Sequence, residues 1–166
     1  MATQEKYREK EIWQALQDVT DPEIPVISVV DLGIINKVEA KENGSVYVNM
    51  TPTFVGCPAV QFMQQKVKKK IEDLDYHDVR VEVDYESSWH SNKITDKGRK
   101  QLKEFGLSPP AKYSGEVSEK ELEDAECPHC GSTNTALNTP FGPTLCRAIH
   151  HCNNCNQAFQ QFKPID

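Results

Sequence analysis

Two pairs of cysteines near the end of the sequence have the spacing of a metal site. Each pair is a C-x-x-C motif, and the four candidate ligands are Cys127, Cys130, Cys152 and Cys155. The tight turn of such a motif directs both sulfur atoms toward one point, so two motifs can close a tetrahedral site with no open position for a substrate. We therefore expect the four thiolates to hold one structural Zn²⁺ in a ribbon spanning residues 127–166.

A zinc ion would also explain how so short a module folds. About 40 residues bury too little apolar surface to be stable alone, and metal binding of about 10–16 kcal/mol makes up the difference. An iron–sulfur cluster on the same thiolates is the main alternative, and free or oxidised cysteines are the second. We interpret His129, His150 and His151 as supporting or surface groups, and Cys146 as a small buried residue of a strand.

Cys57 is the single cysteine outside the C-terminal part, and its neighbours suggest chemistry. Pro58 follows it at the predicted start of a helix, where the helix dipole favours a thiolate. The proline-stiffened loop 20–33 carries Asp21 and Glu23. Carboxylates beside a thiolate are unfavourable unless a cation lies between them, so the three residues predict transient metal handling. The alternative is a capped loop beside a small buried cysteine.

The elements that must position these residues form a small α+β domain. Apolar periodicity predicts helices at 4–18, 58–74 and 94–105, and strands at 34–41, 45–50 and 78–84. Asn43-Gly44 predicts a two-residue hairpin between the first two strands. The resulting order, α-β-β-α-β, is typical of a layered domain with its helices on one face of the sheet.

A change in composition predicts the domain organisation. Pro109-Pro110 interrupts regular structure, and the residues that follow are strongly acidic. We therefore predict a first domain at 1–106, an acidic linker at 107–126 and the zinc ribbon at 127–166.

Charge and hydropathy argue against several functions. The 166 residues carry a formal net charge of −6, and Arg147 and Lys163 are the only basic residues of the ribbon, so nucleic-acid binding is disfavoured. No segment approaches the roughly 20 apolar residues of a membrane span, and the N-terminus lacks an apolar signal. We expect a cytoplasmic protein with reduced thiols and no membrane or nucleic-acid partner.

Three motifs of the first domain resemble a known family. They are DPEIP at 21–25, VDLG at 30–33 and GCP at 56–58. In this order, and separated by a hairpin, they resemble the small domain shared by SufT and the eukaryotic cytosolic iron–sulfur targeting factors. The similarity covers about residues 8–85.

The rest of the chain resembles the PaaD family (also called PaaJ), the accessory subunits of the phenylacetyl-CoA epoxidase (1,2-phenylacetyl-CoA monooxygenase) system. The matching residues are Trp89, ITDKGRKQL at 94–102, FGLSPP at 105–110 and FGPTLCRA at 141–148. One departure is the sequence HSNK at 90–93, where the family has a second tryptophan and an acidic residue.

The resemblance implies a supporting role without catalytic residues. Such a subunit would insert or repair iron or iron–sulfur centres, with Cys57, Asp21 and Glu23 touching the iron. Its partners would be the other epoxidase subunits, including the iron–sulfur reductase, and a homodimer stays open. The alternatives are a general iron–sulfur carrier and a zinc-ribbon adaptor that binds proteins. A catalytic di-iron subunit is disfavoured because its ligands come from long bundle helices.

Overall fold

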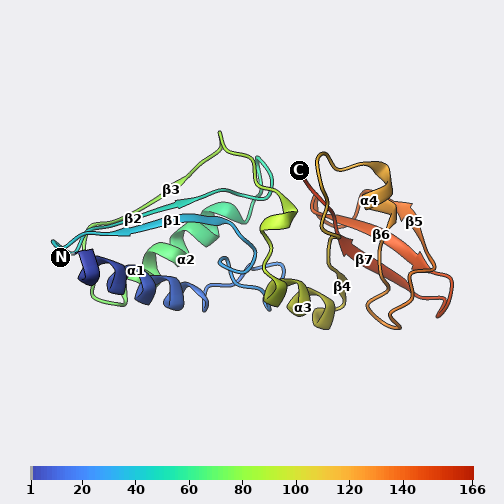
Figure 1. The fold of residues 1–166 in the computed structure, drawn as a ribbon, viewed down its shortest axis with the longest axis horizontal. Coiled ribbons are helices and arrows are strands. Elements are labelled where there is room, and N and C mark those ends of the chain that lie inside the picture. The colour runs from blue at the N-terminus through green and yellow to red at the C-terminus, as the bar shows by residue number, and fades with distance from the viewer. Residues whose placement is uncertain (1) are drawn as a thin grey trace. The chain divides into compact units, whose positions relative to one another are not determined.

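The computed structural model describes residues 2–166 and divides the chain into two compact units (Figure 1). The first unit ends at Ser88, and the second runs from Trp89 to Asp166. None of the helices within residues 2–166 has the length and apolar character that crossing a membrane requires.

The first unit is an α+β domain with the predicted order α-β-β-α-β, so the predicted fold class is confirmed. Its elements are α1 (Ala2–Leu16), β1 (Ile35–Ala40), β2 (Val46–Met50), α2 (Val60–Glu72) and β3 (Val79–Val83). The sheet order is β1-β2-β3, with β1 antiparallel and β3 parallel to β2. Both helices cover the same face of this sheet (Figure 1).

Alternation along the strands explains why one face of the sheet is covered. Val38, Val48 and Val81 lie side by side in the strand register and are all buried. The opposite face is polar, and there the Tyr47 hydroxyl donates to the Glu82 carboxylate at 2.8 Å. An apolar face next to a polar face requires a cover on one side only, which α1 and α2 supply.

The turn between β1 and β2 is one residue longer than predicted. Lys41 still pairs with Ser45, because its N–H donates to the Ser45 carbonyl at 2.9 Å. The loop therefore has three residues, and Gly44 takes the left-handed conformation (φ 84°) that such loops need. The guanidinium of Arg8 donates to the carbonyls of Lys41 and Glu42 at 3.0 Å, which stabilises the longer turn.

The second unit consists of a 3₁₀ turn, two helices and a four-stranded sheet. Its elements are the 3₁₀ turn η1 (Ser91–Lys93), α3 (Asp96–Phe105), β4 (Leu107–Ser108), α4 (Glu119–Glu123), β5 (Thr135–Thr139), β6 (Arg147–Cys152) and β7 (Ala158–Phe162). The sheet order is β4-β7-β6-β5, in which β4 runs parallel to β7 and the other pairs are antiparallel.

The division between the units differs from the predicted boundary at residue 106. Trp89 packs against Phe162 of the ribbon, with ring centroids 5.8 Å apart. The guanidinium of Arg99 donates to the carbonyls of Ser91 and Pro110, and this clamp joins α3 to the chain that follows it. Helix α3 therefore belongs with the ribbon.

The predicted linker 107–126 is also part of the second unit. Leu107 pairs with Gln160 of β7, and Pro110 and Ala125 are buried. Composition was misleading here, because the acidic side chains of the segment are largely exposed while its few apolar side chains are packed.

Candidate functional site

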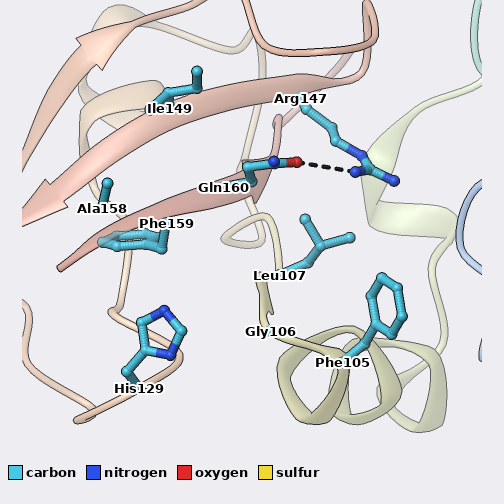
Figure 2. A pocket seen from close by; sticks show the side chains of 9 residues that line it. All are labelled: Phe105, Gly106, Leu107, His129, Arg147, Ile149, Ala158, Phe159 and Gln160. Carbon is cyan, nitrogen blue, oxygen red and sulfur yellow. Dashed lines mark hydrogen bonds between the residues drawn. The ribbon is translucent and has the colours of Figure 1, made fainter.

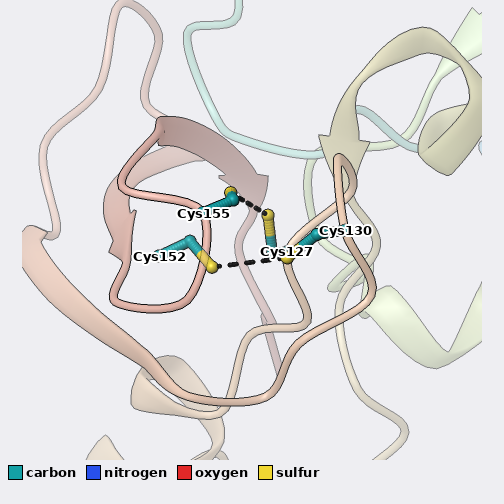
Figure 3. A group of neighbouring side chains, drawn as sticks. All are labelled: Cys127, Cys130, Cys152 and Cys155. Carbon is teal, nitrogen blue, oxygen red and sulfur yellow. Dashed lines mark hydrogen bonds between the residues drawn. The ribbon is translucent and has the colours of Figure 1, made fainter.

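The two C-x-x-C motifs come together in the second unit, as the sequence predicts. Their four sulfur atoms all lie within 4.8 Å of one another (Figure 3). Across the two motifs, the Cys127 and Cys155 sulfurs are 3.7 Å apart and the Cys130 and Cys152 sulfurs 3.6 Å apart. This is the only such group of potential metal ligands within the described residues 2–166.

Both motifs fold into the same turn, which explains why they present their sulfurs alike. Gly131 donates its N–H to the Cys127 carbonyl, and Asn156 donates to the Cys152 carbonyl, each at 2.9 Å. Both donors adopt the left-handed conformation, with φ of 74° and 59°. Glycine and asparagine are the residues that reach it most easily, so the sequence CPHCG matches CNNCN in physical terms.

Backbone hydrogen-bond donors favour the thiolate form of Cys152, while the neighbouring thiols Cys152, Cys127 and Cys130 raise the pKa of Cys155, so the proton of the group stays with Cys155. The backbone N–H groups of Cys155 and Asn154 hold the pKa of the Cys152 thiol at about 6, well below its ordinary value. The side-chain amide of Asn154 lies 3.6 Å from the Cys130 sulfur. Cys127 and Cys152 are fully buried, together with Phe159 and Ala125. A buried group of thiolates requires a cation to be stable.

The separations fit one tetrahedral ion. A Zn–S bond of about 2.3 Å gives a tetrahedron edge of about 3.8 Å, close to both measured distances. An iron–sulfur cluster would divide the four thiolates among several irons and so spread them farther apart. The four cysteines would therefore hold Zn²⁺, which stabilises the fold, and the cluster alternative fits the geometry less well.

The histidines and the fifth cysteine of the ribbon differ in burial. His150 is fully buried, stacks on Phe159 with centroids 5.4 Å apart, and meets the Gln161 side chain at 2.8 Å. His129 is exposed. Cys146 is half-buried in the turn that precedes β6, with its sulfur 3.1 Å from the Thr144 hydroxyl, so its predicted place in a strand is wrong.

One pair of residues has the Glu-x-x-His spacing of di-iron enzymes, Glu126 and His129. It lies in the first cysteine turn rather than on a helix. The Glu126 carboxylate instead pairs with the ammonium of Lys103 at 2.5 Å. This arrangement does not resemble the helical ligand pair of a di-iron site.

Cys57 lies in the loop that leads into α2 of the first unit, where it is half-buried. Its carbonyl accepts the Val60 N–H at 3.3 Å, so a single turn precedes the helix, which begins at Val60 and not at Pro58. Cys57 therefore does not lie directly before the first helical residue, as the sequence predicted that it would. The Ala59 and Val60 N–H groups nevertheless act on the thiol.

The environment of Cys57 favours the neutral thiol, although the helix start predicted from the sequence would by itself favour the thiolate. Burial raises the pKa of Cys57 most, the Ala59 N–H lowers it, and the carboxylates of Asp21 and Glu23 raise it further. The net pKa lies above its ordinary value. The three residues thus interact, and the negative charges of the two carboxylates oppose the thiolate, as the sequence leads us to expect where no cation lies between them.

The loop that carries the two carboxylates has a defined conformation. One oxygen of Asp21, Oδ1, accepts the N–H groups of Glu23 at 2.7 Å and Ile24 at 3.0 Å. The Asp21 N–H in turn donates to the Ile27 carbonyl at 3.0 Å. This turn uses only one carboxylate oxygen of Asp21 for the backbone, so the second oxygen has the chemistry to bind a cation.

The VDLG motif supports this loop. Asp31 is buried, its N–H donates to the Ser28 hydroxyl oxygen at 3.0 Å, and its Oδ2 lies 3.0 Å from the same oxygen. Gly33 has a φ of 75°, which a residue with a side chain seldom adopts. The motif therefore shapes the loop.

Two family models match the chain in succession. The model "Iron-sulfur cluster assembly protein" covers residues 9–83, and the model "PaaD zinc beta ribbon domain" covers residues 111–163. The first match ends within the first unit, and the second begins inside the predicted linker, which the structure assigns to the second unit.

Relatives and solved structures agree with both matches. A candidate 1,2-phenylacetyl-CoA epoxidase subunit from Escherichia coli (strain K12) is 34% identical over 93% of this chain and 92% of its own length. An Fe-S protein maturation auxiliary factor from Porphyromonas gingivalis (strain ATCC BAA-308 / W83) is 35% identical over 57% of this chain and 90% of its own. The crystal structure of a DUF59 domain from Bacillus anthracis covers 61% of this chain and 97% of its own, with a TM-score of 0.58 and 26% identity.

The similarity to the Escherichia coli protein extends over nearly the full length of both chains, and the two family models match this chain one after the other. These findings confirm the resemblance stated from the sequence. The chain belongs to the PaaD family, which it shares with the Escherichia coli epoxidase protein.

Proposed function

We propose that this chain is a non-catalytic accessory subunit that assembles or repairs iron or iron–sulfur centres of a phenylacetyl-CoA epoxidase system. The observation that carries the proposal is the electrostatic environment of Cys57, where Asp21 and Glu23 oppose the thiolate. Iron would reverse this opposition, because a cation between the three groups turns repulsion into attraction.

Iron binding at this site is an exchange of a proton for a metal ion. Fe²⁺ would bond to the Cys57 sulfur as the thiol proton leaves to solvent, and a carboxylate oxygen would share the charge. Transfer to a client protein reverses the step, since the thiol is reprotonated when the iron leaves. A raised pKa makes the sulfur a weaker holder of metal at neutral pH, which suits a carrier that must release its cargo.

The zinc ribbon has a separate role in this proposal. Its four cysteines close around one ion, so Zn²⁺ supplies structural stability there and the site offers no position for cargo. The ribbon would present a surface to the other subunits of the epoxidase system, including its iron–sulfur reductase.

A general iron–sulfur carrier is the second candidate function. It is favoured by the match to the Porphyromonas gingivalis maturation factor, which covers 90% of that protein but only 57% of this chain. In that case the remaining part of the chain, which holds the zinc ribbon, would not serve to recognise the epoxidase subunits.

Anaerobic iron binding to the zinc-loaded protein tests the site. With ⁵⁷Fe²⁺ and a colorimetric chelator as competitor, the unaltered protein should bind one labile iron, and Cys57→Ser should lose it. Cys146→Ser is the matched control, because Cys146 is also a half-buried cysteine outside the zinc cluster. Equal iron binding by unaltered protein and Cys57→Ser would contradict the proposal.

A further inference from the structure

The second unit contains a cavity that the zinc site and the iron proposal do not use. Its volume is about 360 Å³. The nine residues that line it come from the end of α3, from β4, β6 and β7 and from the first cysteine turn (Figure 2): Phe105, Gly106, Leu107, His129, Arg147, Ile149, Ala158, Phe159 and Gln160.

The floor of the cavity is apolar, and one of its side chains is exposed to solvent. Leu107 and Phe159 are buried beneath it, and Figure 2 shows Phe105 and Leu107 directed toward the strand that carries Phe159. Phe105 lies at the edge of the apolar floor that Leu107 and Phe159 form, and 44% of it is exposed. A ligand that covered this ring would remove apolar area from water, which favours binding.

One end of the cavity is cationic. The guanidinium of Arg147 lies there and donates one hydrogen bond to the Gln160 side chain at 2.9 Å, which fixes its direction (Figure 2). None of the nine lining residues is acidic. A carboxylate is therefore the complementary partner for this end.

The size and openness of the cavity limit what can bind. At about 360 Å³ it is at the lower end of the range of about 300–1,000 Å³ for ligand pockets, which leaves room for one large side chain and its neighbour. His129 and Ala158 on its border are exposed. A polypeptide can therefore enter and leave along the border.

We propose that this cavity is a docking site for a protein segment in which a large apolar side chain lies next to a carboxylate. The apolar side chain would cover Leu107, Phe159 and the exposed ring of Phe105. The carboxylate would pair with Arg147. This inference goes beyond the proposed function and involves neither Cys57 nor iron.

Fluorescence polarisation with three labelled peptides tests the proposal on the full-length, zinc-loaded protein. The probe GSDFEGS combines the phenylalanine with two carboxylates, GSNFQGS removes the charges, and GSDAEGS removes the ring. The first should bind most tightly. Arg147→Gln should weaken its binding about tenfold or more, as the loss of a charge-assisted hydrogen bond predicts, and should abolish the preference over GSNFQGS.

Variants of exposed residues serve as the apolar arm and the controls. Phe105→Ala should weaken GSDFEGS and GSNFQGS alike and preserve the preference for charge. Phe141→Ala, which removes a 76% exposed ring, and Lys120→Gln, which removes an exposed charge of the same unit, should leave binding unchanged. Zinc content and melting temperature should be the same in all four variants.

Several results would overturn the docking site. Equal affinity for the charged and uncharged phenylalanine peptides would refute the role of Arg147, and equal losses in the control variants would refute the location. Absence of binding of every peptide at about 1 mM would refute the site itself. Tighter binding of N-acetylphenylalaninate than of GSDFEGS would assign the cavity to a small carboxylate instead.

Discussion

Removal of one zinc ligand should unfold the second unit and leave the first unit folded. The 78 residues from Trp89 to Asp166 would have a total stability of about 4–12 kcal/mol if they followed the usual value per residue. The binding of a structural zinc ion contributes about 10–16 kcal/mol, which equals or exceeds that total. Cys127 is fully buried among the other ligands, so Cys127→Ser should remove most of this contribution.

The two tryptophans of the chain make this prediction measurable. Trp13 lies on α1 of the first unit, and Trp89 is buried against Phe162 of the second. Variants that retain only one tryptophan therefore report one unit each. In Cys127→Ser, the Trp89 emission should be that of an exposed indole already at 25 °C, whereas the Trp13 signal should keep its thermal transition.

A cysteine outside the cluster provides the control for this experiment. Cys146→Ser should retain zinc and both transitions. A Cys127→Ser protein whose Trp89 transition moves by no more than about 1 kcal/mol would refute the reasoning, because a stable apo-ribbon would mean that packing alone holds the second unit.

Three further predictions concern the first unit. Iron affinity should rise about tenfold per pH unit at neutral pH, because the raised pKa of Cys57 keeps a proton that the metal must displace, and competition titrations at several pH values measure this slope. Asp31→Ala should destabilise the first unit by about 1 kcal/mol, because it removes the hydrogen bond between the Ser28 hydroxyl and the Asp31 carboxylate while Gln17 still accepts from that hydroxyl, and urea unfolding monitored at Trp13 tests the value. A fragment of residues 1–88 should unfold cooperatively, whereas a fragment of 1–106 should show the same transition and lose its added residues rapidly to protease; protection of those residues would contradict the division of the units.

Local patterns were sufficient to predict the first unit. Alternating valines and the apolar side of each helix specify which face is buried, and this information lies within a few residues of sequence. The same holds for the zinc ligands, because each C-x-x-C turn is a local structure with a left-handed residue, Gly131 or Asn156, at the same place.

Features that depend on distant contacts were not predictable from local patterns. The second unit gains Trp89 and Arg99 only because Phe162 and Pro110 meet them across many intervening residues. The segment HSNK, which departs from the family pattern, holds the C-terminal end: the Ser91 N–H donates to the Ile165 carbonyl at 2.8 Å. No spacing rule reveals such a pair.

The net pKa of Cys57 could not be predicted for a similar reason. The sequence reveals the helix start, which favours the thiolate, but not how deeply the thiol is buried. Burial proves to be the larger effect, and the distant carboxylates of Asp21 and Glu23 add to it. The docking cavity is likewise formed from α3, β6 and the first cysteine turn, which are far apart in the sequence.

The iron content of the client tests the central claim most directly. The epoxidase subunits and their reductase would be co-expressed with this chain or with Cys57→Ser, purified, and analysed for iron per subunit, with Cys146→Ser as the control. We predict that Cys57→Ser folds and keeps its zinc but leaves the client deficient in iron or iron–sulfur centres, while the control gives full occupancy. A fully loaded, fully active epoxidase from cells that contain only Cys57→Ser would contradict the account, and Cys57 would then be a packing residue.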